Sequence, residues 1–189
     1  MEEIEVKYTH VNVEDLKTKL EKLGAVFVGR FEYKRKSYDY TDKRLADIHA
    51  WVRLRDEGNK IVLTYKQRFG HEGDTLREGG MKEVEVEVSD FAKADELLKS
   101  IGLVEKFYEE NIRERYTLGH VEIDIDSWPL IPPYVEIEGA SWDEVRNVSD
   151  SLGFDWDKHL RCSTMQIYEM EGIDENAYSI LTFDQQIKK

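Results

Sequence analysis

The chain has a single cysteine and no long apolar run, and both features narrow its class. Cys162 is the only cysteine among 189 residues, which excludes a disulfide framework and a thiolate metal cluster. We expect Cys162 to be a small buried apolar residue. No eighteen apolar residues run together, and the first residues, MEEIEVKY, are charged. We therefore expect a cytoplasmic protein without a signal peptide or a membrane-spanning helix.

Positive charge is also scarce. The sequence has 27 Lys and Arg residues against 40 Asp and Glu residues, a formal net charge of −13 at pH 7. This balance argues against nucleic acid and membranes as partners, because both carry negative charge. Any site for a phosphate group must therefore be local. The five histidines are not spaced as ligand pairs, so a zinc site is not expected.

A recurring unit organises the chain: a strand with Glu-x-Glu, an amphipathic helix, and a glycine that ends the helix. The helix of the second copy is predicted to begin near Asp90, and the helix of the third opens with a capping box formed by Ser141 and Glu144. The copies begin at Glu3-Ile4-Glu5, Glu83-Val84-Glu85 and Glu136-Ile137-Glu138, and their helices end at Gly24, Gly102 and Gly153. The pattern therefore predicts three helices.

Eight segments alternate charged and apolar residues with the period of a β-strand. Four carry carboxylates: Glu3/Glu5, Glu83/Glu85/Glu87, Glu122/Asp124/Asp126 and Glu136/Glu138. Four carry cations: Lys34/Lys36, Arg53/Arg55, Lys66/Arg68 and Arg113/Arg115. Each strand thus has an apolar face, which the helices can cover, and a charged face. We expect an α+β fold in which a closed eight-stranded antiparallel β-barrel forms a tunnel with helices packed outside.

The two kinds of charged strand together indicate metal-dependent phosphate chemistry. Carboxylates repeated on four strands repel one another unless cations or metal ions neutralise them. Carboxylate pairs suit a hard, oxygen-preferring ion such as Mg²⁺ or Mn²⁺, and guanidinium groups can each bind two phosphate oxygens. The sequence therefore predicts a small-molecule triphosphate as the substrate and Mg²⁺ or Mn²⁺ as the cofactor. It leaves a homodimer open.

These segments resemble the CYTH superfamily, the triphosphate tunnel metalloenzymes. Glu3-Ile4-Glu5-Val6-Lys7 is similar to the Glu-x-Glu-x-Lys opening of that family. The companion segments follow in family order over about residues 3–139: Arg53-Leu54-Arg55, Leu63-Thr64-Tyr65-Lys66, Lys82-Glu83-Val84-Glu85, residues 123–129 and Tyr134-Val135-Glu136-Ile137-Glu138-Gly139. The resemblance implies one domain over residues 1–189, with its core at 3–139 and a helical tail at about 141–189. The superfamily includes class IV adenylyl cyclases, thiamine triphosphatases and inorganic triphosphatases.

The resemblance also implies roles for individual residues. The implied metal ligands are Glu3, Glu5, Asp124, Asp126, Glu136 and Glu138, with Glu83 and Glu85 as additional candidates. The implied triphosphate-binding residues are Lys7, Arg53, Arg55, Lys66 and Arg113, followed by Lys34, Lys36, Lys82 and Arg115. Lys7 would activate water together with Tyr38 or Tyr40. The sequence departs from the family where Tyr38-Asp39-Tyr40-Thr41-Asp42 replaces Tyr-Phe-Asp-Thr-Pro and where Met81 replaces a basic residue.

Four functions fit this pattern to different degrees. A triphosphate hydrolase is the leading hypothesis. A class IV adenylyl cyclase would use the same charged groups, but no set of residues builds an adenine pocket, and Trp51 and Trp128 are expected to pack in the protein interior. A non-catalytic polyphosphate- or nucleotide-binding module would gain nothing from stacked carboxylates. A glycosidase is disfavoured, because the neighbouring cations would keep its general acid ionised.

Overall fold

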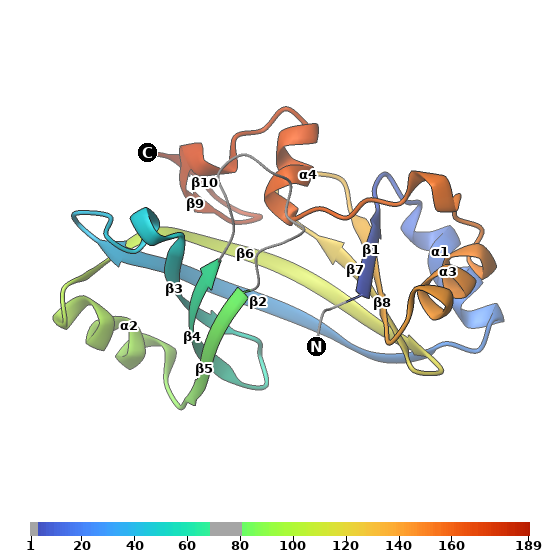
Figure 1. Cartoon of the computed structure of the whole chain (residues 1–189), viewed down its shortest axis with the longest axis horizontal. Helices are drawn as coiled ribbons and strands as arrows, with labels where there is room; N and C mark the ends of the chain where they lie inside the picture. The colour runs from blue at the N-terminus through green and yellow to red at the C-terminus, as the bar shows by residue number, and fades with distance from the viewer. Residues whose placement is uncertain (1–3, 69–80) are drawn as a thin grey trace. The chain divides into compact units, whose positions relative to one another are not determined.

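The computed structural model of the chain describes residues 4–68 and 81–189 (Figure 1). Glu3 lies outside the described residues, and the side chain of Arg68 is not described. The chain divides into two compact units. Unit 1 contains Met1–Phe31 and Asn111–Glu175, and unit 2 contains Glu32–Glu110 and Asn176–Lys189. Two long strands, β2 (Val26–Tyr40) and β6 (Leu103–Leu118), contribute to both units.

Unit 1 combines antiparallel strands with two helices packed on their apolar face. Its elements are β1 (Ile4–Tyr8), α1 (Val13–Lys22), β7 (Val121–Ser127), β8 (Tyr134–Gly139), α3 (Trp142–Ser151), a short 3-10 helix (Trp156–Lys158) and α4 (Thr164–Met170). The strand order is β1-β8-β7-β6-β2. Leu16 and Leu20 of α1 and Val145 of α3 are buried against Val6 and Ile137 of the strands. Burial of this apolar face fixes the opposite, charged face of β1, β7 and β8.

Unit 2 has the same layered plan. Its elements are a 3-10 turn (Ala46–Ile48), β3 (Ala50–Asp56), β4 (Ile61–Arg68), β5 (Met81–Val88), α2 (Phe91–Ser100), β9 (Tyr178–Leu181) and β10 (Gln186–Lys188). The strand order is β6-β2-β3-β4-β5. The helix α2 buries Ala94 and Leu98 against Tyr38, Leu54 and Leu103. The structure is thus an α+β fold with four α-helices.

The three predicted helices and their ends are confirmed. Asp90 begins α2 by accepting the Lys93 N–H at 3.0 Å, and Ser141 begins α3 by accepting the Glu144 N–H at 3.3 Å. The Glu144 carboxylate accepts the N–H of Ala140 instead of that of Ser141, so the predicted capping box is only half formed. Gly24, Gly102 and Gly153 follow α1, α2 and α3, each with positive φ, a conformation that glycine adopts without strain.

The eight predicted strands are present, and two further strands follow. The sheet order runs from β1 to β5, and no pairing between β1 and β5 occurs in residues 4–68 and 81–189. Closure into a barrel therefore stays a prediction. The expected helical tail ends in the β9–β10 hairpin, because the segment after α4 finds an edge of β6 with which to pair. No helix in the described part of the chain is long and apolar enough to span a bilayer.

Candidate functional site

The charged face of unit 1 gathers carboxylates from three strands. Antiparallel pairing places Glu5 of β1 opposite Glu138 of β8, and Glu136 of β8 opposite Asp124 of β7. Residues directly opposite one another share a face of the sheet. The face therefore carries Glu5, Glu122, Asp124, Asp126, Glu136 and Glu138. All the described members of the predicted metal-ligand set lie on it, with the additional candidates Glu83 and Glu85 in unit 2.

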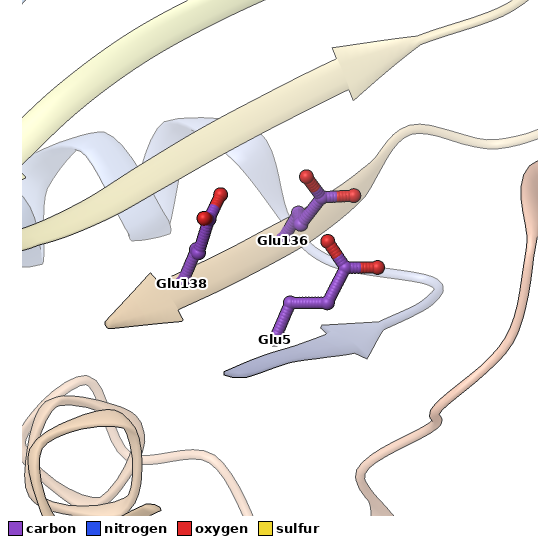
Figure 2. Close-up of side chains that lie close together, drawn as sticks. All are labelled: Glu5, Glu136 and Glu138. Carbon is purple, nitrogen blue, oxygen red and sulfur yellow. The ribbon is translucent and has the colours of Figure 1, made fainter. Parts of the chain in front are cut away.

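Three of these carboxylates converge closely enough to share an ion. Figure 2 shows Glu5 on β1 and Glu136 and Glu138 on β8, with their carboxyl groups on the same side of the sheet. One oxygen atom from each residue lies within 4.8 Å of the others. A set of carboxylate oxygens at this spacing fits a hard divalent ion such as Mg²⁺, which is commonly held by few protein carboxylates together with substrate oxygens.

Lys7 lies at the edge of this carboxylate cluster and balances part of its charge. Its Nζ forms ion pairs with Glu5 and, at 2.9 Å, with Glu136, and the side chain is buried. Burial disfavours the charged amine, but the carboxylates of Glu136 and Glu5 outweigh burial and raise the pKa of Lys7. Burial likewise opposes ionisation of Glu136, yet Lys7 and Arg113 lower the pKa of its carboxyl. Both groups are therefore charged at neutral pH.

The other two predicted ligands in unit 1, Asp124 and Asp126, are held by arginines. Arg113 donates from Nε and Nη2 to the two oxygens of Asp126 at 2.8 and 2.6 Å, and Arg115 donates in the same way to Asp124 at 2.8 and 2.7 Å. Arg113 also contacts Glu136 at 3.4 Å. Such forked pairs neutralise buried carboxylates. In this arrangement Arg113, predicted to bind the triphosphate, binds protein carboxylates.

The charged face of unit 2 is cationic. Pairing of β3 with β4 places Arg53 opposite Thr64, and Trp51 opposite Lys66. Trp51, Arg53 and Arg55 alternate along β3, so their side chains and that of Lys66 lie on the same face of the sheet. Pairing of β2 with β3 adds Arg35, which lies opposite Arg55. Arg53, Arg55 and Lys66 thus lie on one face, as predicted, and we call them, together with Arg35, the Arg53 group.

Arg35 was missed by sequence analysis, which assigned the neighbouring lysines Lys34 and Lys36 to this face. The register shows why: Lys36 lies opposite Leu54, whereas Arg35 lies opposite Arg55. Lys36 instead pairs with Asp95 at 2.8 Å and Glu105 at 3.0 Å, on the α2 side. Lys34 shares the parity of Lys36. The alternation itself could have revealed Arg35, because a strand with cations at positions 34, 35 and 36 offers two choices of face.

Arg53 carries the least compensated charge in this group. It forms no ion pair with the described part of the chain, and its buried Nε has no hydrogen-bond partner there. Burial and the adjacent Arg55 and Arg35 guanidinium groups lower the pKa of Arg53 to about 10. Burial and Arg53 also lower the pKa of Lys66, against the attraction of Glu83. Like charges gathered in this way favour an anionic ligand, which would relieve their repulsion.

The predicted acidic residues of β5 belong to this face and partly offset its charge. Glu83 pairs with Lys66 at 3.1 Å, and the hydroxyl of Thr64 donates to Glu85 at 3.3 Å. Arg55 forms an ion pair with Glu57. Lys82 lies on the opposite face of β5, where its Nζ is 5.9 Å from the ring centre of Tyr65. The structure therefore places Lys82 away from the Arg53 group.

Tyr38 is not on the charged face. Its side chain is 0% exposed and packs in the core of unit 2, and its hydroxyl donates to Asp95 at 2.8 Å. Burial and the Asp95 carboxylate raise the pKa of Tyr38, so the phenol keeps its proton at neutral pH. The amine of Lys7 keeps its proton as well. These surroundings argue against the predicted use of Lys7 with Tyr38 to remove a proton from water.

Comparison with known proteins identifies the family. The CYTH domain family matches residues 1–175. The chain belongs to this family. The match includes the carboxylate cluster of unit 1 and the Arg53 group of unit 2, and it confirms the family resemblance on which the residue roles depend.

Proteins similar to this chain cover most of its length. A Methanocaldococcus jannaschii protein named "Putative adenylate cyclase" is 24% identical over 176 residues, covering 88% of this chain and 98% of the relative. A solved Pyrococcus horikoshii OT3 structure is 26% identical, with a TM-score of 0.63 and coverage of 88% and 99%. A Hippeastrum structure, described as a "Putative adenylyl cyclase" with dominant triphosphatase activity, is 16% identical, with a TM-score of 0.59 and coverage of 90% and 96%.

Proposed function

We propose that this CYTH protein is a metal-dependent enzyme that hydrolyses a phosphoanhydride bond of inorganic triphosphate or of a triphosphate monoester. The observation that carries the proposal is the Arg53 group, in which half-buried cations lie side by side and Arg53 forms no ion pair in residues 4–68 and 81–189, although Glu83 and Glu85 partly offset its charge. Such a group is costly to keep unless an anion binds it. A triphosphate supplies several negative charges whose oxygens guanidinium groups can bind in pairs. The closed barrel predicted from the sequence is kept as part of this proposal.

Glu5, Glu136 and Glu138 would hold Mg²⁺ or Mn²⁺. Their converging oxygens fit such an ion, which when bound supplies positive charge to phosphate oxygens. Lys7 contributes a fixed ammonium beside two of these ligands. Asp124 and Asp126 would set the charge and position of the ligands through Arg113, which contacts both Asp126 and Glu136.

The cationic residues would bind the phosphate groups and stabilise the charge of the transition state. Arg53 and Arg55 bind phosphate oxygens through their guanidinium groups, and Lys66 adds a point charge. Phosphoryl transfer to water passes through a loose transition state, in which positioning and charge stabilisation matter more than covalent chemistry by the protein. The absence of an obvious base among Lys7 and Tyr38 is therefore compatible with hydrolysis: water attacks phosphorus, the leaving phosphate departs with the electron pair of the broken anhydride bond, and a phosphate oxygen takes the proton that the water loses.

Cyclisation of ATP to cyclic AMP and pyrophosphate is the second candidate. The name of the Methanocaldococcus jannaschii relative favours it, whereas the description of the Hippeastrum protein favours triphosphatase activity. One structural observation also supports cyclisation: Trp51 lies opposite Lys66 on the cationic face of β3, where an indole ring could stack on a purine. Trp128, in contrast, is buried with its ring 6.4 Å from that of Tyr168, as expected for packing.

A substrate panel separates the two reactions. Tripolyphosphate, thiamine triphosphate and ATP are supplied with Mg²⁺ or Mn²⁺, and phosphate, pyrophosphate and cyclic AMP are measured separately. We expect phosphate release from tripolyphosphate or from a triphosphate monoester to exceed formation of cyclic AMP. Faster conversion of ATP to cyclic AMP would establish the cyclase instead. Binding of all three compounds without turnover would indicate a binding module.

The metal site is tested on the same panel. Excess EDTA should abolish turnover, and Glu136→Gln should lower kcat by about 100-fold or more, as when a preorganised electrostatic group is removed. Glu14→Gln is the matched control, because Glu14 is an exposed residue of α1. Full activity in EDTA, or a Glu136→Gln protein as active as the control, would rule out this metal site.

A further inference from the structure

The last residues of the chain belong to unit 2, although the family match ends at residue 175. Asn176–Lys189 forms the β9–β10 hairpin, in which β9 pairs with β6 in parallel at two positions: Ile180 opposite Tyr108 and Leu181 opposite Glu109 (Figure 1). Leu181 is only 3% exposed and Thr182 is also buried. The hairpin is therefore packed against β6 at the level of Glu109.

Glu109 is a buried carboxylate directly beside this contact. It is 5% exposed, and its Oε2 has no hydrogen-bond partner in the described part of the chain. Its Oε1 lies 3.4 Å from Nε of Arg35. Because a buried carboxylate requires a compensating charge, the pair restrains both side chains. The contact between Oε1 and Nε is an ion pair that does not meet hydrogen-bond geometry.

Arg35 reaches the Arg53 group from the neighbouring strand. It lies opposite Arg55 in the pairing of β2 with β3, and its charge is one cause of the lowered pKa of Arg53. The side chain of Arg35 is 15% exposed. A guanidinium beside two others is destabilised by repulsion unless an opposite charge compensates it. Glu109 provides an acidic contact at 3.4 Å.

The geometry points to Arg35 as a further phosphate-binding residue of the Arg53 group and to Glu109, packed against the β9–β10 hairpin, as the residue that positions it. This inference rests on the proposed function, because it presumes a phosphate ligand on the cationic face. It extends that function by giving the hairpin a role: Leu181 packs at the level of Glu109, and Glu109 orients Arg35 toward the anion.

The test measures binding of tripolyphosphate in EDTA, so that the cationic face is probed without turnover. Calorimetry on the full-length protein should show that Arg35→Met and Arg53→Met each raise the Kd by about tenfold, the loss expected for one charged contact. Glu109→Gln should raise the Kd by about threefold, because Arg35 loses its orientation. Arg35→Lys should not restore binding, since a lysine lacks the forked guanidinium.

A double variant separates positioning from simple charge. In the Arg35→Met background, Glu109→Gln should have no further effect on the Kd. Leu181→Ala should reproduce part of the Glu109→Gln effect, with Phe183→Ala, an exposed residue of the same hairpin, as the matched control. Circular dichroism and thermal unfolding show whether each variant folds. If Leu181→Ala does not fold, Glu109→Gln and Arg35→Met decide the outcome.

Three outcomes would overturn the inference alone. Tighter binding in Glu109→Gln would mean that the carboxylate only opposes the anion, and an unchanged Kd in Arg35→Met would remove Arg35 from the phosphate site. An equal effect of Glu109→Gln with and without Arg35 would uncouple the two residues. If Arg53→Met still weakened binding in these cases, the proposed function would stand. A wild-type protein that does not bind tripolyphosphate would overturn both.

Discussion

Units 1 and 2 share a layered plan, but their charged faces differ in how the charges are paired. In unit 1 the charged face is an ion-pair network: Arg113 and Arg115 hold Asp126 and Asp124, and Lys7 joins Glu5 to Glu136. In unit 2 the arginines lie on one face, and burial together with the charges of Arg55 and Arg35 lowers the pKa of Arg53. Unit 1 therefore keeps an excess of carboxylates around Glu5, Glu136 and Glu138, which suits a metal ion, whereas unit 2 leaves Arg53 without an ion pair in its described residues, which suits an anion.

The largest expected effect comes from breaking the network of unit 1. Arg113→Met leaves Asp126, which is 0% exposed, without its forked partner. We expect the free energy of unfolding to fall by about 3–5 kcal/mol, the cost of an uncompensated buried charge. Urea denaturation measures this loss.

The partner residue provides the control for this first prediction. Adding Asp126→Asn to Arg113→Met removes the unpaired charge and should restore part of the lost stability. Arg146→Met is a second control, because Arg146 is a surface residue of α3 that lies 3.8 Å from Asp150. A loss below about 1 kcal/mol in Arg113→Met would mean that the paired network does not stabilise unit 1.

The same substitution in unit 2 should act with the opposite sign on stability. Arg53→Met removes repulsion from Arg55 and Arg35, so the ligand-free protein should gain about 0.5–2 kcal/mol, as is common when a functional site is relieved of strain. Its kcat/KM on tripolyphosphate should fall by the equivalent of about 2–4 kcal/mol, because transition-state charge loses a donor. Thermal unfolding and steady-state kinetics give the two values.

Lys93→Met is the matched control for Arg53→Met, because the Lys93 side chain is 82% exposed on α2. It should change neither quantity. If Arg53→Met destabilised the free protein as Arg113→Met does, the contrast between the two units would be wrong. If it left kcat/KM unchanged, Arg53 would lie outside the catalytic site.

The smallest expected effect concerns Tyr38. Tyr38→Phe removes the hydrogen bond to Asp95, but Lys36 and Lys99 still bind that carboxylate. We expect a loss of about 0.5–1.5 kcal/mol of stability and no change in kcat, because the phenol lies in the core. Tyr40→Phe, the other tyrosine considered as a base, is the comparison variant. A large fall in kcat for Tyr38→Phe or Tyr40→Phe, with unchanged stability, would show that this tyrosine takes part in catalysis.

The sequence alone was enough to predict the local structure and much of the site. Apolar spacing and capping residues predicted α1, α2 and α3 with their ends, since these depend on contacts within a few residues. Alternation predicted eight strands with a charged face. The family resemblance implied that Glu5, Glu136 and Glu138 are metal ligands, and the structure places one oxygen of each within 4.8 Å of the others.

The tertiary structure decided which charges meet. A shift of one residue turns every side chain of a strand to the other face, so only the observed register of β2 assigns Arg35 to the Arg53 group and Lys36 to Asp95. The partners of Arg113 likewise follow from strand pairing, which joins residues far apart in the sequence. The pairing of the C-terminal hairpin with β6 has the same cause, because no local pattern specifies which sheet edge a strand will join.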